Sequence, residues 1–113
     1  MLVPSDAALV RIFLGEDDRS GGRPLYEAIV LAAREKGLAG ATVLRGPMSF
    51  GHSSHIHTAK VLQLSKDLPM IVEMVDAEDK LRTFLDGIET MLGSCLVTIE
   101  KVQVLRYGTT KPA

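Results

Sequence analysis

The sequence contains no tryptophan, and its few tyrosines and phenylalanines make up only 4% of the chain. Aliphatic side chains and methionine must therefore build the core. Cys95 is the only cysteine, which excludes an internal disulfide and favours a reducing, cytoplasmic compartment. No apolar run approaches the roughly 20 residues of a membrane-spanning helix, and the beginning of the chain lacks the pattern of a signal peptide. These absences predict a cytoplasmic protein without direct membrane insertion.

Neither sign of charge dominates, since 13 basic and 14 acidic side chains give a formal net charge of −1. A nucleic-acid-binding surface would need a basic excess, so we do not expect nucleic acid as a partner. Hydrophobic residues make up 46% and charged residues 24% of the 113 residues, as in ordinary soluble domains. We expect one domain over residues 8–107, with flexible ends at 1–7 and 108–113.

Two stretches have the apolar spacing of amphipathic helices. The first covers residues 24–36. It begins at Pro24, because proline fits the first turn of a helix, and it stops before Gly37, a common C-terminal residue. The second covers residues 77–92, and we expect Asp76 to cap its N-terminus.

Four strands are expected from short apolar runs. Pro69 lacks a backbone N–H, so it should stand at an edge or a break of its strand rather than at the centre. In the last strand the apolar alternation changes phase at Glu100–Lys101, which predicts a bulge. The expected strands cover residues 8–15, 39–45, the two pieces 59–64 and 68–75, and 96–107.

The order of these elements predicts an α+β, ferredoxin-like βαββαβ fold. Such a fold has a four-stranded antiparallel sheet with two helices on one face, and each helix joins two parallel strands that have another strand between them. One rim of the sheet then collects the connections 15–19, 45–57 and 93–95, while Asp76 and Arg106 fall at the opposite rim. The first rim is the candidate site, because the unusual residues gather there.

The connection between the second and third strands is long and polar. It combines positive charge, glycines, an aromatic ring and hydroxyls, which suits a phosphate-bearing anion held by a guanidinium and backbone N–H groups. The competing interpretation is a solvated surface loop, since no Walker-type or GxGxxG phosphate loop is present. The residues are Arg45, Gly46, Phe50, Gly51 and His57, with Arg19 from the preceding connection and the hydroxyls of Ser49, Ser53, Ser54 and Thr58.

Three histidines, His52, His55 and His57, form an H-x-x-H-x-H cluster. Imidazole is the commonest metal ligand, so the cluster can hold Zn²⁺ or Cu²⁺ with Asp17 or Asp18 as a fourth ligand. Adventitious metal binding is the alternative, because this spacing matches no standard metal motif. We do not expect an enzyme, since the sequence shows no nucleophile elbow and no paired base and orienting residue.

Three segments resemble a known family: VRIFLGEDDRSGGRPLYEAIV, GLAGATVLRGPMSFGHSSHIHTAKVLQLSKDLPMIVEMVD and VTIEKVQVLRY. Over about residues 8–107 the chain is similar to the PII-like family called domain of unknown function 190. The resemblance implies the fold of PII signalling proteins and a homotrimer. It also implies that an adenine nucleotide (AMP, ADP or ATP) binds in clefts between subunits. In PII proteins the loop between strands two and three is the T-loop, which contacts partners.

The resemblance also assigns ligand-site residues. They are Arg45, Gly46, Phe50 and Gly51 at the base of the T-loop, Gly93 and Ser94 before the last strand, and Arg106 where PII proteins have two arginines. The chain departs from PII proteins in having only GSC where they have a phosphate loop with glycine and lysine. Within the family, position 57 is histidine, position 55 is basic and position 52 is small. That pattern favours anion recognition by Arg45, His55 and His57 over a three-histidine metal site.

The sequence therefore predicts a small-molecule-sensing protein with a T-loop-like arm over residues 45–57. A small anion or nucleotide would order this arm, which would then contact a protein or a membrane transporter of unknown identity. The alternative is a metal-binding trimer, related in fold to the copper-tolerance CutA proteins, that uses His52, His55 and His57.

Overall fold

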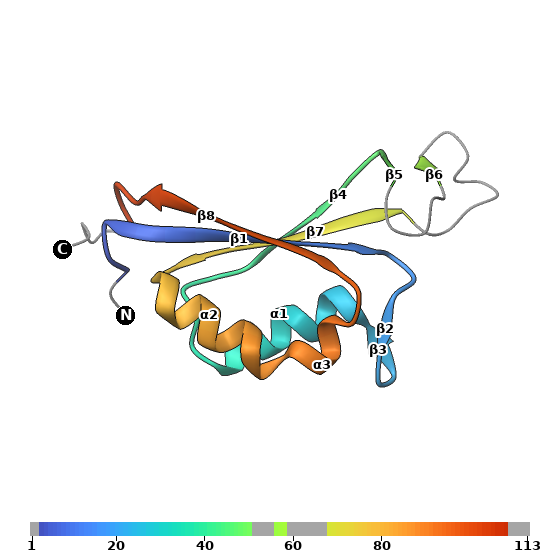
Figure 1. Cartoon of the computed structure of the whole chain (residues 1–113), viewed down its shortest axis with the longest axis horizontal. Helices are drawn as coiled ribbons and strands as arrows, with labels where there is room; N and C mark the ends of the chain where they lie inside the picture. The colour runs from blue at the N-terminus through green and yellow to red at the C-terminus, as the bar shows by residue number, and fades with distance from the viewer. Residues whose placement is uncertain (1–2, 51–55, 59–67, 109–113) are drawn as a thin grey trace.

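A four-stranded antiparallel sheet carries its helices on one face (Figure 1). The computed structural model describes residues 3–50, 56–58 and 68–108. The sheet order is β4–β7–β1–β8, and these strands are Thr42–Arg45, Pro69–Asp76, Asp6–Gly15 and Leu96–Gln103. The helices are α1 (Leu25–Glu35), α2 (Glu78–Gly87) and α3 (Glu89–Leu92). The expected ferredoxin-like fold is confirmed, because β1 and β4 are parallel with β7 between them, and β7 and β8 are parallel with β1 between them.

Two separate two-stranded sheets lie outside the main sheet, and neither was expected from the sequence. β2 (Arg19–Ser20) and β3 (Arg23–Pro24) form a hairpin directly before α1. β5 (Met48–Phe50) and β6 (Ile56–Thr58) pair within the connection that follows β4. The expected strand piece 59–64 lies outside the described residues.

The core lies between the sheet and the helices. From Ala8 onward on β1 and throughout β7, every second residue is buried, as expected for strands with one face against a core. Aliphatic side chains and methionine dominate this core, as the low aromatic content of the chain requires. The core includes Ala8, Val10, Ile12 and Leu14 from β1, Met70, Val72 and Met74 from β7, and Leu25, Ile29, Ala33, Leu81, Phe84 and Ile88 from the helical layer.

The first helix lies within one residue of its predicted bounds at each end. Pro24 precedes its first residue, where the missing backbone N–H costs no helical hydrogen bond. Gly37 has φ +73°, a left-handed conformation that favours glycine, and it ends the helix. The N–H of Leu38 then bonds back to the carbonyl of Ala33 at 3.0 Å. The proline and glycine signals were therefore sufficient to place α1.

The second helix is interrupted, which corrects the single helix expected over 77–92. α2 ends at Gly87, and Ile88 leaves the helical conformation with φ −116° before the single turn of α3. Glycine weakens a helix because its backbone is free to adopt other conformations. The Ile88 side chain at this break is buried in the core.

Asp76 is not the helix cap that the sequence predicted. Ala77 holds the capping position, and no side chain caps α2. Asp76 is instead the last inward residue of β7, only 1% exposed. Its Oδ2 accepts the N–H of Ala39 at 2.9 Å and its Oδ1 accepts the N–H of Ala77 at 2.8 Å. The carboxylate therefore connects the segment after α1 to the start of α2.

The last strand is shorter than expected and contains no bulge. β8 ends at Gln103, and its residues pair one to one with β1 from Leu96 to Gln103. The change of phase has another cause. Val97 and Ile99 pack against the core on the helical side, whereas Val102 pairs with Ala7 on the other face of the sheet. Apolar residues on both faces shift the pattern without inserting a residue.

Candidate functional site

The connections predicted to converge lie at one rim of the sheet. Arg45 pairs with Met70, Met70 pairs with Leu14, and Leu96 pairs with the adjacent residue Phe13. The end of β4, the start of β7, the end of β1 and the start of β8 therefore follow one another along the right side of the sheet in Figure 1, with β4 and β8 at its two edges. We call this the β4–β8 rim. It contains residues 15–18, 45–46, 68–69 and 93–95.

Backbone hydrogen bonds fix the β4–β8 rim. The N–H of Gly46 donates to the carbonyl of Pro69 at 2.8 Å, and the N–H of Glu16 donates to the carbonyl of Leu68 at 2.7 Å. A Cβ on Gly46 would lie 3.0 Å from Cγ of Pro69, so glycine allows the close approach of the two strands here. Pro69 is the first residue of β7, consistent with its predicted exclusion from the centre of a strand.

Arg45 forms an ion pair with Glu16. Its Nη2 donates to Oε2 of Glu16, and the two side chains are 54% and 22% exposed. Arg45 ends β4, and Glu16 directly follows β1, so the pair connects two strands that have β7 between them. The guanidinium predicted for anion binding is therefore present at the rim and holds a carboxylate.

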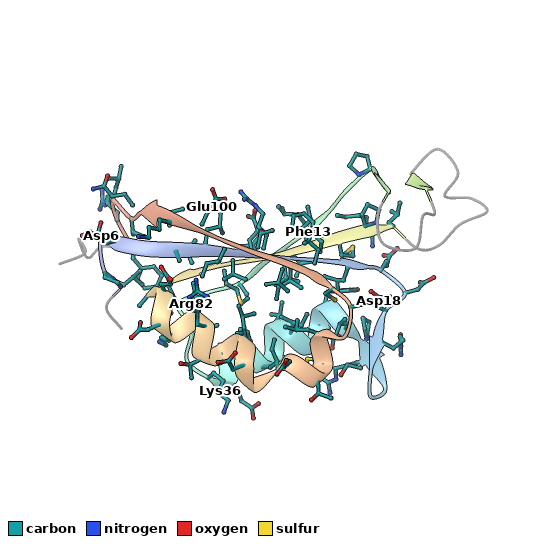
Figure 2. The ribbon with its side chains drawn as sticks, viewed as in Figure 1. Asp6, Phe13, Asp18, Lys36, Arg82 and Glu100 are labelled. Atoms are coloured by element: carbon teal, nitrogen blue, oxygen red, sulfur yellow. The ribbon has the colours of Figure 1, made fainter. Side chains whose placement is uncertain are left out.

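The connection after β1 is folded around Asp18, which is labelled in Figure 2. Its Oδ2 accepts the N–H of Gly15 at 2.9 Å, and its carbonyl accepts the N–H of Leu25 at 2.7 Å. Arg19, also considered for the site, donates to the carbonyl of Gly22 at 2.9 Å within the β2–β3 hairpin. The structure thus assigns Arg19 to the hairpin and leaves Arg45 as the arginine whose ion pair lies at the rim.

Gly93 and Ser94 stand at the same rim, between α3 and β8. Gly93 has φ +54°, and the N–H of Cys95 bonds to the carbonyl of Leu92 at 3.0 Å. Cys95 is partly buried. Burial raises the pKa of its thiol, and the charge of Asp18 raises it further.

Cys95 should therefore react slowly. We expect alkylation by iodoacetamide at pH 8 to be slower than for a free thiol, because a raised pKa lowers the fraction of reactive thiolate. Because a raised pKa keeps the thiol protonated, the rate should still be increasing above pH 9. Mass spectrometry of quenched samples measures the rate, and a rate equal to or faster than that of a free thiol would contradict this assignment.

Arg106 lies far from Arg45 within one subunit. Gln103 pairs with Asp6, at the end of β1 opposite the β4–β8 rim. Beyond it, the hydroxyl of Tyr107 donates to the carbonyl of Ala39 at 2.7 Å. The opposite rim thus holds Arg106, as the topology predicted, and one subunit does not bring Arg106 and Arg45 together.

The predicted arm is described only in part. β5 and β6 form an antiparallel ribbon in which Ser49 pairs with His57 and Phe50 with Ile56. Gly51, His52 and His55 lie outside the described residues, so the three-histidine metal site remains a prediction. Among residues 3–50, 56–58 and 68–108, no group of three or more metal-ligating side chains is placed to hold an ion. Nor does this part of the chain include a helix long and apolar enough to cross a membrane.

The face of the sheet opposite the helices carries an apolar row across all four strands. Leu44, Ile71, Phe13 and Leu96 lie side by side in register, and Leu96 is 61% exposed. No described helix covers this face (Figure 1), on which Figure 2 shows Phe13 and Glu100. We call it the open face. Such an exposed apolar row is typical of a surface that another protein covers.

Next to the apolar row, Arg11 forms ion pairs with two carboxylates. Its Nε donates to Oε2 of Glu73 at 2.9 Å, and its Nη1 donates to Glu100. These hydrogen bonds raise the pKa of Arg11, which stays charged at any physiological pH. The open face therefore combines an apolar row with an ion-paired cluster.

Similar proteins match this chain over nearly its whole length. Residues 7–104 match the model of the family described as Uncharacterized ACR, COG1993, also called domain of unknown function 190. A UPF0166 protein of Aquifex aeolicus (strain VF5) is 39% identical over 97 residues, which cover 86% of this chain and 91% of that protein.

Solved structures show the same fold at low sequence identity. CPII, a nitrogen regulatory PII-like protein from Thiomonas intermedia K12 bound to ADP, AMP and bicarbonate, aligns with a TM-score of 0.68 and 16% identity. The match covers 89% of this chain and 90% of CPII. A PII-like signalling protein from Thermus thermophilus aligns with a TM-score of 0.63 and 16% identity, over 92% of this chain and 93% of that protein. The fold is therefore that of PII-like proteins.

Proposed function

We propose that this chain, which belongs to the family called domain of unknown function 190, is a PII-like signalling protein. An adenine nucleotide (AMP, ADP or ATP) or another small anion binds at the β4–β8 rim. One observation carries this proposal: the rim joins Arg45, the close approach of Gly46 to Pro69, and the Gly93–Cys95 connection from distant parts of the sequence. The ligands of CPII support this class of ligand.

The chemistry of the rim suits such a ligand. A guanidinium recognises phosphate or carboxylate oxygens through paired N–H groups, and Arg45 has more than half of its side chain exposed to receive them. Glycines at 46 and 93 let a ligand approach the backbone closely. We assign further positive charge to His55 and His57 of the arm and a covering ring to Phe50.

We propose that the functional unit is a homotrimer. Within one subunit Arg106 stands at the rim opposite Arg45, so we assign Arg106 of a neighbouring subunit to the ligand site. The open face supports this assembly, because its row from Leu44 to Leu96 offers an apolar contact area that the helices leave uncovered. The site then lies in a cleft between subunits.

The arm over residues 45–57 transmits the signal in this proposal. Its described strands β5 and β6 lie beyond the rim in Figure 1, directly after Arg45 and Gly46. A ligand at the rim favours one state of the arm only if it binds that state more tightly. The ordered arm presents a surface to its target, which is a protein or a membrane transporter of unknown identity.

This role is binding rather than catalysis, and it takes place in the cytoplasm. The sequence offers no paired nucleophile and base, and the single cysteine fits a reducing compartment. Zn²⁺ or Cu²⁺ at His52, His55 and His57 is the competing assignment, and no contact among the described residues favours it.

Hydrogen exchange tests the proposal. With AMP, ADP or ATP at saturating concentration, residues 46–57 should exchange at least about tenfold more slowly than without ligand. Arg45→Ala should abolish this protection, because it removes the guanidinium at the base of the arm. Arg34→Ala, on α1 away from the rim, is the matched control and should leave the protection intact. Protection that persists in Arg45→Ala, or none in the unchanged protein, would show that the rim is not the ligand site.

A further inference from the structure

Arg45 is already paired with a carboxylate in the ligand-free chain. Its Nη2 donates to Oε2 of Glu16, so an anion that binds this guanidinium must replace Glu16 or share the arginine with it. We propose that Glu16 is the internal competitor of the ligand at Arg45, and that it determines specificity by favouring anions of low charge over ATP. This inference rests on the proposed function and adds to it the selection among ligands.

The backbone keeps Glu16 at the rim even when its side chain is displaced. The N–H of Glu16 is bound to the carbonyl of Leu68 at 2.7 Å, and Leu68 is buried. On the other side, Asp18 closes the turn by accepting the N–H of Gly15. A displaced Glu16 carboxylate therefore remains at the rim, where its charge repels a bound anion.

The charges around Arg45 add to this repulsion. Asp17 and Asp18 follow Glu16 directly, whereas the nearest arginine in sequence, Arg19, bonds to the carbonyl of Gly22 in its own hairpin. Residues 93–95 add no charge to the rim. Among the described rim residues of one subunit, carboxylates thus outnumber arginines, so their repulsion of a ligand grows with each negative charge that the ligand carries. AMP and bicarbonate carry fewer negative charges than ATP.

The test compares the affinities of AMP, ADP and ATP by isothermal titration in the full-length protein. Glu16→Gln keeps the size of the side chain and removes its charge. We expect it to tighten AMP binding about threefold to tenfold and ATP binding by a larger factor, so that the ratio of ATP to AMP affinity increases. The difference between unchanged protein and variant should decrease as salt is added, because the effect is electrostatic.

Glu27→Gln is the matched control. Glu27 lies in the first turn of α1 and is 3.9 Å from Arg23, so this change also removes one carboxylate from an ion pair on the surface. It should leave the ratio of affinities unchanged. Glu16→Ala provides a second variant, and thermal melting shows whether each variant is folded.

The outcomes separate this inference from the proposed function. Nucleotide binding with the same affinities and ratio in Glu16→Gln as in the unchanged protein overturns the inference alone. Weaker binding of all three nucleotides in Glu16→Gln also overturns it, because Glu16 would then support the site. Binding in neither protein overturns both the inference and the proposed function, whereas binding in Glu16→Gln alone supports both.

Discussion

Replacing Asp76 with alanine should destabilise the protein by about 3 kcal/mol, the largest loss that we expect from a single polar side chain. The carboxylate is buried and accepts the N–H groups of Ala39 and Ala77. Lys80 Nζ lies 3.5 Å from it and also donates to the carbonyl of Gly37 at 2.7 Å. Alanine would leave two partly buried N–H groups without their acceptor. Urea denaturation followed by circular dichroism measures the change.

Asp79→Ala is the control for this prediction. Asp79 stands in the first turn of α2, is exposed, and its Oδ1 accepts the N–H of Lys80 at 2.9 Å. Its loss should cost about 0.5 kcal/mol, the usual effect of a favourable charge at a helix N-terminus. Equal and small effects in both variants would mean that Asp76 does not join the segment after α1 to the start of α2.

Replacing Ile71 with lysine should dissociate the proposed trimer. Ile71 occupies the middle of the apolar row, between Leu44 and Phe13 on the face without helices. In a single subunit the lysine remains in water, but in the assembly it is an unpaired charge within an apolar contact. We expect the dissociation constant to rise at least about 100-fold, equivalent to about 2.7 kcal/mol. Sedimentation of dilute protein measures it.

Leu31→Lys is the matched control for Ile71→Lys. Leu31 is 40% exposed on α1, in the helical layer, so its replacement puts the same charge on the opposite side of the subunit. It should leave both assembly and nucleotide binding unchanged, whereas Ile71→Lys should lose both. A trimer that persists in Ile71→Lys would contradict the assignment of the open face.

Local signals were sufficient to predict most of the fold. The short apolar runs of β1 and β7 and the Pro24 and Gly37 signals at the ends of α1 predicted the correct order of elements, because each signal acts within a few residues. The break at Ile88 was not predicted, because an apolar residue at helical spacing also fits an unbroken helix. Asp76 was misassigned for a similar reason, since an acidic residue before a helix resembles a cap.

The location of the candidate site could be predicted from the sequence, but the contacts within it could not. Topology brought Arg45, Gly46 and Gly93 to one rim without any known motif. The partner of Arg45 was not predicted, because Glu16 stands in an acidic run that is typical of a solvated turn and lies 29 residues away in sequence. Pairing between Ser49 and His57 was missed too, since strands of three residues are too short to show an alternation.

Isothermal titration of metal-stripped protein with AMP, repeated after addition of Zn²⁺, distinguishes nucleotide binding at the β4–β8 rim from metal binding by the histidines. We expect saturable AMP binding that does not need Zn²⁺ and is lost in Arg45→Ala. No heat with AMP, together with a stoichiometric heat with Zn²⁺ that disappears in His52→Ala or His55→Ala, would contradict it and place the function in the histidine cluster instead.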